Sequence, residues 1–81
     1  MRLPRDLGGR DLAALLRKLG YEVVRQTGSH MRLTAIVNGV ETHVPVPAHS
    51  PLKIGTVGGI LNEVAAQQGV TREVLEARLF Q

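Results

Sequence analysis

The segment from Arg25 to Arg32 places an imidazole close to two guanidinium groups. Its Gly28-Ser29 pair predicts a tight turn between two strands, with His30 at the exit of the turn. A His side chain titrates near neutrality, so a positioned His can take or give a proton at working pH. Guanidinium groups are permanently charged forks that bind phosphate oxygens. These residue types would suit chemistry on a phosphodiester, but on this stretch alone the favoured interpretation is a surface hairpin with an exposed His after its turn.

The other His residues and the Ser beside His30 suggest two further kinds of site. Ser29 and His30 are neighbours on a strand and point to opposite faces, so a hydrolytic dyad is not expected and Ser29 is interpreted as a turn residue. His30, His43 and His49 lack a carboxylate or thiol at ligand spacing, so no metal site is expected. His43 is interpreted first as a solvated strand residue, and an auxiliary role for His43 and His49 is left open.

A third candidate region lies at the start of the second predicted helix. Lys53, Gly55 and Thr56 stand where a helix N-terminus could cradle a phosphate, although Thr56 could equally be an ordinary N-cap. Gly58 and Gly59 follow in the first turns, where each costs the helix about 1 kcal/mol relative to Ala. This cost suggests that another backbone or a ligand approaches the helix there.

The composition limits the possible partners and compartments. The chain has 81 residues, no Cys, a formal charge of +3 and a pI of about 10.2, which together favour a small domain with an anionic partner in a reducing cytoplasm. No apolar run reaches the length of a membrane span, and the first residues lack the apolar core of a signal peptide. One Tyr, one Phe and no Trp argue against a single-strand binder that stacks bases on aromatic rings.

Apolar residues at helical spacing predict the helices that must support these groups. Residues 10–19 carry a stripe of Leu side chains that predicts a helix. Gly20 is placed to end this helix, and Tyr21 is placed to pack back on it. The second helix is predicted after Thr56 and ends at Gly69, and a short third helix follows Thr71. The apolar stripe of the second helix consists of Val57, Ile60, Leu61, Val64 and Ala65; that of the third consists of Leu75, Leu79 and Phe80.

Three strands are predicted between these helices, over residues 21–26, 30–37 and 40–46. The Asn38-Gly39 pair predicts a type I′ hairpin, and its two-residue loop fixes the register of the last two strands. The resulting pairs Val37–Val40, Leu33–Val44 and Met31–Val46 share the core face.

The opposite face of the sheet is then left with the polar residues. It receives His30, Arg32 and Thr34, with His43 opposite Thr34. Pro45 and Pro47 cannot donate ladder hydrogen bonds, so the third strand should be an edge strand there or should end in an irregular segment.

This order of elements predicts an α+β fold of the α-β-β-β-α type found in the double-stranded-RNA-binding domain, with the helices on one face of the sheet. A single domain is expected over residues 1–81, with a core at about 9–69 and a C-terminal helix in 70–81. The fold by itself does not imply a function.

Several ordered motifs resemble the HicA toxins, which are small ribonucleases of bacterial and archaeal toxin–antitoxin pairs. Residues 25–30 match the pattern R-x-x-G-S-H, and residues 44–49 match V-P-V-x-x-H. Residues 53–57, followed by Ile60-Leu61, are similar to K-x-G-T-L…I-L, and residues 7–12 and 69–73 fit the usual opening and end. The resemblance covers nearly the whole chain in the right order.

The resemblance implies cleavage of mRNA by a single catalytic His without a metal or other cofactor, and inhibition by a HicB-type antitoxin. It assigns the acid–base role to His30, and the expected RNA- or phosphate-binding residues are Arg25, Gly28, Ser29, Arg32, Lys53 and Thr56. The alternative is a non-catalytic RNA-binding or protein-interaction module on the same fold.

Overall fold

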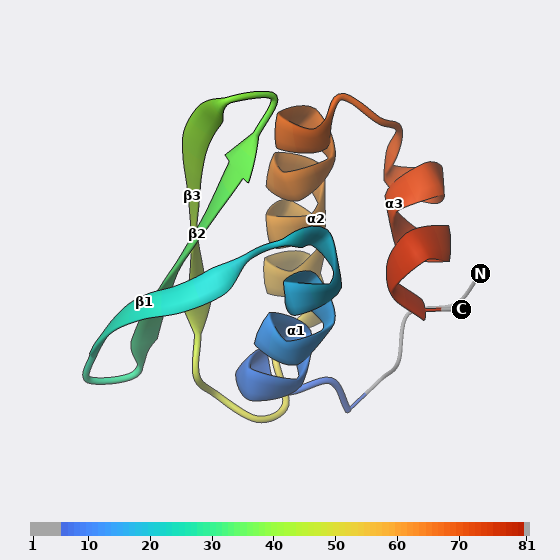
Figure 1. The fold of residues 1–81 in the computed structure, drawn as a ribbon. Coiled ribbons are helices and arrows are strands. Elements are labelled where there is room, and N and C mark those ends of the chain that lie inside the picture. The colour runs from blue at the N-terminus through green and yellow to red at the C-terminus, as the bar shows by residue number, and fades with distance from the viewer. Residues whose placement is uncertain (1–5, 81) are drawn as a thin grey trace.

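The computed structural model describes residues 6–80, so the expectations for the first five residues and for the last one lie outside the described part. The helices are α1 (Gly9–Leu16), α2 (Ile54–Gln68) and α3 (Arg72–Phe80), with a 3₁₀ turn η1 (Arg17–Leu19) after α1. The strands are β1 (Glu22–Thr27), β2 (His30–Val37) and β3 (Val40–Pro47). Figure 1 shows the predicted α-β-β-β-α order, followed by the C-terminal helix.

The first helical segment ends at Gly20, as its sequence predicts. Gly20 takes a left-handed conformation with φ of +93° and donates its N–H to the Arg17 carbonyl at 3.1 Å. The Tyr21 N–H then reaches back to the Leu16 carbonyl at 3.2 Å, which completes a Schellman cap. Both Leu16 and Tyr21 are fully buried, so this cap fixes the direction in which the chain enters β1. The helix is one turn shorter than expected, because its last three residues tighten to a 3₁₀ turn.

The sheet has the order β1-β2-β3, and β2 and β3 pair in the predicted register. Asn38 and Gly39 both have positive φ, as a type I′ turn requires, and the three predicted pairs of β2 with β3 are present. Pro45 and Pro47 fall at alternate positions of β3, which is an edge strand. Counted from the two-residue turn, these positions direct the backbone nitrogen away from β2, so the missing N–H groups remove no ladder bond.

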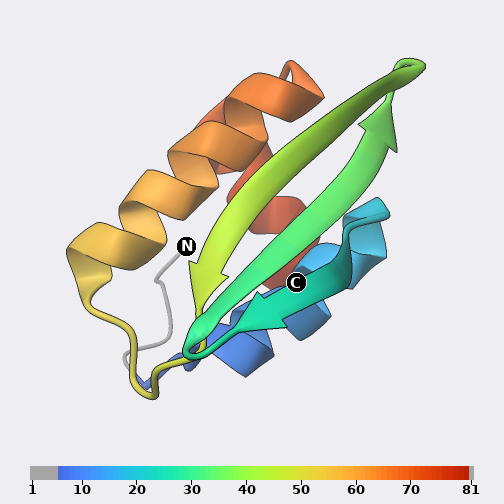
Figure 2. The same cartoon turned by 90° about the vertical axis from the view of Figure 1, so that its left-hand side faces the viewer.

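The elements form layers, with one face of the sheet covered and the other open. α1 and α2 lie against the sheet, and α3 packs on the far side of these two helices (Figure 1). Figure 2 shows the sheet in front, with α2 beside β3. Buried side chains from the covered face of the sheet and from all three helices meet in one core, among them Leu12, Leu16, Tyr21, Met31, Leu33, Val44, Val46, Leu61, Val64, Leu75 and Leu79. The predicted fold class is therefore confirmed.

The start of α2 differs from the sequence prediction. The helix begins at Ile54 with Lys53 as its N-cap residue, so the prediction of Thr56 as the N-cap was wrong. The physical reason lies just before the helix: Leu52 is buried, and its N–H donates to the Leu7 carbonyl at 2.8 Å. This anchor brings the chain into helical geometry early, and Thr56 falls within the first turn of α2.

The two glycines in the early turns of α2 have different surroundings. A Cβ at Gly58 would lie 3.4 Å from Nη1 of Arg72, whereas a Cβ at Gly59 would have no neighbouring atom within 4 Å. The expected close approach is therefore made at Gly58, by a side chain of α3 rather than by a backbone. Gly59 faces open space.

The third helix has the predicted cap. The Thr71 hydroxyl accepts the N–H of Val74 at 3.2 Å, and Leu75 and Leu79 are fully buried. Within residues 6–80, no helix is both long and apolar enough to cross a membrane.

Candidate functional site

The open face of the sheet carries the polar side chains that the sequence places there. His30 and Arg32 alternate along β2 with the buried Met31 and Leu33, and both are exposed. Side chains two residues apart on a strand point to the same face. Since a strand rises about 3.3 Å per residue, the Cα atoms of His30 and Arg32 lie roughly 7 Å apart.

A β-bulge in β1 places the second guanidinium on this face. Val23 pairs with Leu33 and Arg25 pairs with Arg32, so Val24 is the extra residue. Regular alternation from the buried Tyr21 through Val23 would send the Arg25 side chain toward the core. The bulge instead turns Arg25 onto the open face, directly opposite Arg32.

The sequence analysis missed this bulge. Two signals in the sequence could have indicated it. Counted from the two-residue Gly28-Ser29 turn, Arg25 must face Arg32, whereas counted from the helix it must face the core. The adjacent apolar pair Val23-Val24 also breaks the alternation.

The turn that carries His30 is fixed by backbone contacts. Gly28 has φ of +58° at the first central position of the two-residue loop, which is typical of a type II′ turn. The Ser29 carbonyl accepts the N–H of Ala48 at 2.6 Å, which ties the turn to the segment after β3. That segment is held in turn by α1, because the Gly9 N–H donates to the His49 carbonyl at 2.8 Å. His30 is thus positioned by the first turn of α1 as well as by the sheet.

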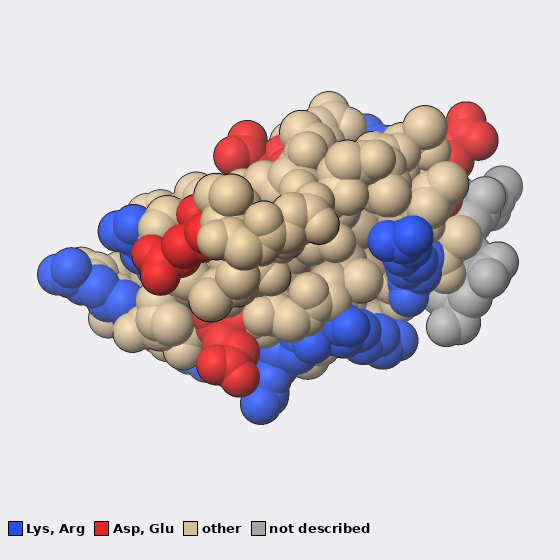
Figure 3. Space-filling view, turned by 45° about the horizontal axis from the view of Figure 1, so that its top comes forward, with Lys and Arg blue, Asp and Glu red and all other residues tan. Residues whose placement is uncertain are grey.

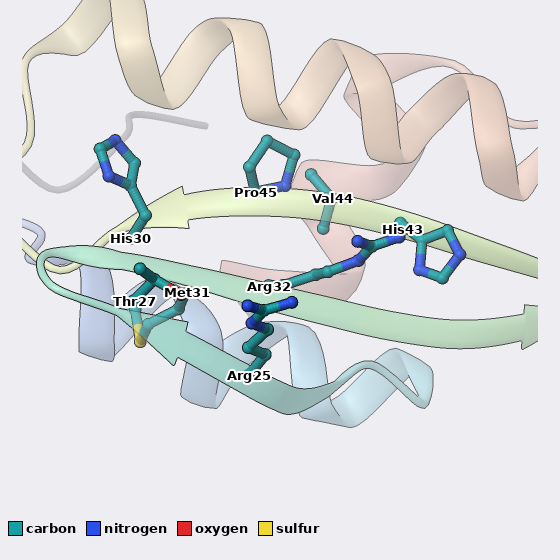
Figure 4. A pocket seen from close by; sticks show the side chains of 8 residues that line it. All are labelled: Arg25, Thr27, His30, Met31, Arg32, His43, Val44 and Pro45. Atoms are coloured by element: carbon teal, nitrogen blue, oxygen red, sulfur yellow. The ribbon is translucent and has the colours of Figure 1, made fainter.

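A hollow of about 410 Å³ lies on the open face over the turn end of the hairpin; we call it the sheet pocket. It is lined by Arg25, Thr27, His30, Met31, Arg32, His43, Val44 and Pro45. Figure 4 shows the Arg25 guanidinium pointing toward β2, and that of Arg32 pointing toward β3 and His43. The His30 imidazole stands apart near the turn and leans over β3 in the direction of α2 (Figure 4).

The sheet pocket brings two positive charges together, one from β1 and one from β2. Two like charges directly opposite on neighbouring strands destabilise a sheet. Within residues 6–80, the ion pairs are His43–Glu41 and Arg72–Glu76, so neither guanidinium of the pocket is paired with a carboxylate. Elsewhere the charge is dispersed: on the face drawn in Figure 3, basic groups stand in several separate places with acidic groups between them. The local Arg pair, rather than the net charge, makes the open face positive at the sheet pocket.

His43 lies at the other end of the sheet pocket and is held by two neighbours. Its Nδ1 is 3.1 Å from the Thr34 hydroxyl, and its Nε2 is 3.2 Å from a carboxylate oxygen of Glu41. Both ring nitrogens are therefore engaged, and the side chain is 39% exposed. The prediction that His43 faces Thr34 on the open face is confirmed. Across residues 6–80, no three His, Cys, Asp or Glu side chains cluster as metal ligands would.

Several predicted site residues lie outside the sheet pocket. Lys53 and His49 are exposed on the loop before α2, and Gly28 and Ser29 are exposed at the turn, and none of these four lines the pocket. Thr56 lies in a second hollow, between β3 and the N-terminal half of α2, which we call the helix groove. The helix groove also measures about 410 Å³ and is lined by Val44, Pro45, Gly55, Thr56, Gly59, Ile60 and Glu63.

Comparison with known proteins identifies a family. The family model described as the HicA toxin of bacterial toxin–antitoxin systems matches residues 9–66, well over half of the chain. Neither the curated proteins nor the solved structures include a significant match. The matched range runs from the start of α1 to near the end of α2, so it includes both hollows.

Proposed function

Because the chain belongs to the HicA family of bacterial toxins, we propose that it is a metal-independent endoribonuclease that cleaves mRNA in the cytoplasm. In this proposal His30 is the general acid and base. The observation that supports it most directly is the sheet pocket, where the His30 imidazole and two guanidinium groups without a carboxylate partner in residues 6–80 line a single hollow on the open face.

The reaction needs only groups that the sheet pocket contains. The His30 imidazole takes the proton of a ribose 2′-OH, and the 2′ oxygen forms a bond to the adjacent phosphorus. The bond from phosphorus to the 5′ oxygen breaks, and the imidazolium returns its proton to that oxygen. The products are a 2′,3′-cyclic phosphate and a 5′-OH end. No oxidant, metal or cofactor enters this balance.

The guanidinium groups of Arg25 and Arg32 are suited to the charge that builds on phosphorus in this reaction. Each can donate two parallel hydrogen bonds to phosphate oxygens, and such charge-assisted bonds are worth most where water is partly excluded. We assign phosphate binding to this pair, with backbone N–H groups of Gly28 and Ser29 as further donors at the turn. Lys53 and Thr56 are assigned to the outer part of the RNA path, because they lie at the start of α2 and not in the sheet pocket.

A toxin of this family requires an inhibitor in its own cell, and we propose that a HicB-type antitoxin supplies it. An inhibitor that covers the sheet pocket would need carboxylates to face the two guanidinium groups. The exposed position of both Arg side chains supports this mode of inhibition.

The His30→Ala variant tests the catalytic assignment. Cleavage of an RNA oligonucleotide should fall by about 10²–10⁴-fold, the usual contribution of general acid–base catalysis. The fold should persist, because His30 is exposed. His49→Ala is the matched control, since His49 is also exposed and lies outside both hollows.

Three readouts decide the outcome. The wild type should leave 2′,3′-cyclic phosphate ends, should fail on RNA with a 2′-deoxyribose at the cleavage site, and should arrest bacterial growth when expressed without its antitoxin. Equal cleavage by wild type and His30→Ala would refute the role of His30. RNA binding without any cleavage by the wild type would favour the non-catalytic module instead.

A further inference from the structure

We propose that the helix groove binds a nucleobase of the RNA strand whose phosphate lies in the sheet pocket. In this proposal the Glu63 carboxylate selects bases that carry an amino group. The inference rests on the proposed ribonuclease function and adds to it a specificity-determining site. The proposed base site is the surface between β3 and α2, whereas the Arg pair lies on β1 and β2, on the other side of β3.

The two hollows adjoin each other. Val44 and Pro45 line both of them, so an RNA strand that leaves the sheet pocket on this side passes directly over Pro45 into the helix groove. His30 leans over β3 in the direction of α2 (Figure 4), which brings the reacting ribose toward the same side. A nucleotide next to the scissile phosphate can therefore place its base in the groove.

The walls of the groove suit a flat, largely apolar group. Pro45 and Ile60 contribute apolar surface, and a Cβ at Gly55 or at Gly59 would have no neighbouring atom within 4 Å. Internal packing thus does not explain why these two positions lack side chains, although Gly destabilises a helix. Their absence keeps the groove open, and unstacked bases of single-stranded RNA are commonly bound in such hollows by contact with their faces and edges.

Glu63 is held at the groove by a chain of hydrogen bonds. Gln67 accepts the Tyr21 hydroxyl at 2.7 Å and donates to the His43 carbonyl at 2.8 Å, so its amide is fixed in place. The same amide nitrogen lies 3.4 Å from Oε1 of Glu63, a long hydrogen bond that restrains the carboxylate and leaves its other oxygen free of this contact. Glu63 is also one of the residues that line the helix groove, so its carboxylate stands there in a restrained position.

The chemistry of a carboxylate defines the preferred base. An ionised Glu only accepts hydrogen bonds and repels phosphates, so it favours a base edge that carries donors. Guanine offers adjacent N1–H and N2–H donors to both oxygens, cytosine and adenine offer one amino group each, and uracil has no amino group. Guanine should therefore be preferred at this position, followed by cytosine and adenine, with uracil last.

Cleavage of a random-sequence RNA pool, followed by sequencing of the cut ends, tests this order. The wild type should favour guanine over uracil by at least about fivefold at one position beside the cut, the lower range for a paired base contact. Glu63→Ala and Glu63→Gln should reduce this ratio to below about twofold while cleavage of the pool continues. Glu73→Gln is the matched control, because it removes the same charge from an exposed position on α3 and should keep the wild-type ratio.

A binding experiment measures the base preference without cleavage. RNA from the same pool is selected on the immobilised His30→Ala variant, and on the same variant that also carries Glu63→Ala, and the bound RNA is sequenced. Cleavage by the wild type with no base preference, or with one that Glu63→Ala leaves unchanged, overturns the base site and leaves the ribonuclease proposal intact. Base-selective RNA binding by a wild-type protein that does not cleave would instead support the base site and overturn the ribonuclease proposal. Absence of any RNA binding overturns both.

Discussion

Gly9 at the start of α1 provides the most direct test of how the site is supported. A Cβ at this position would lie only 1.7 Å from the Pro47 carbonyl oxygen, and real Cβ contacts essentially never fall below 3.0 Å. In Gly9→Ala, helix and strand end must therefore separate by at least about 1.3 Å, the difference between these two distances. Such a shift breaks the Gly9–His49 hydrogen bond and loosens the Ala48–Ser29 bond behind it.

The size of the effect follows from these contacts. Overpacking of a well-packed site costs about 1–3 kcal/mol, and two backbone hydrogen bonds contribute about 1 kcal/mol each. Replacement of Gly by Ala in a helix returns at most about 1 kcal/mol. The free energy of unfolding should thus fall by about 2–4 kcal/mol, which lowers the melting temperature of so small a domain by roughly 10–30 °C.

Urea unfolding followed by circular dichroism measures this change, and Gly59→Ala is the matched control. The same substitution at Gly59 meets no atom within 4 Å, so it should leave stability unchanged or raise it by up to about 1 kcal/mol. Where Gly9→Ala remains folded, its RNA cleavage should also drop, because the turn that carries His30 has lost its support. Equal stability of Gly9→Ala and the wild type would show that α1 does not pack on the end of β3 as described.

Two further outcomes are expected from the chemistry of the sheet pocket. RNA cleavage should continue in excess chelator, because acid–base catalysis by His30 needs no Lewis acid; loss of activity that zinc or magnesium restores would contradict this. Arg32→Glu should weaken RNA retention and slow antitoxin association together, more at low salt than at moderate salt, since both ligands use one positive surface. Impaired RNA binding with unchanged antitoxin association would mean that the antitoxin docks elsewhere.

The parts of the fold that local rules determine could be predicted from the sequence. The two-residue Asn38-Gly39 turn fixed the register of β2 and β3, and this register alone put His30 and Arg32 on the open face. Gly20 and Gly69 ended their helices where expected. These features depend on contacts between residues close in the chain, where turn chemistry and alternation decide the outcome.

The features that were not predicted depend on contacts between distant segments. The early start of α2 follows from the bond of Leu52 to Leu7, and the need for glycine at position 9 follows from the carbonyl of Pro47. The helix groove likewise exists only because α2 lies beside β3. No periodicity or propensity contains this information, since it arises when the segments pack together.

The pairing of Arg25 with Arg32 links the stability of the sheet to its proposed chemistry. Regular alternation would have spared the sheet this like-charge contact, and the extra residue Val24 creates it. Cross-strand repulsion of this kind destabilises a sheet by up to about 1 kcal/mol. Since no carboxylate within residues 6–80 pairs with either guanidinium, the folded protein does not relieve the repulsion itself. An anion bound between the two side chains, such as a phosphate or an inhibitor's carboxylate, would relieve this repulsion and would thereby raise the free energy of unfolding.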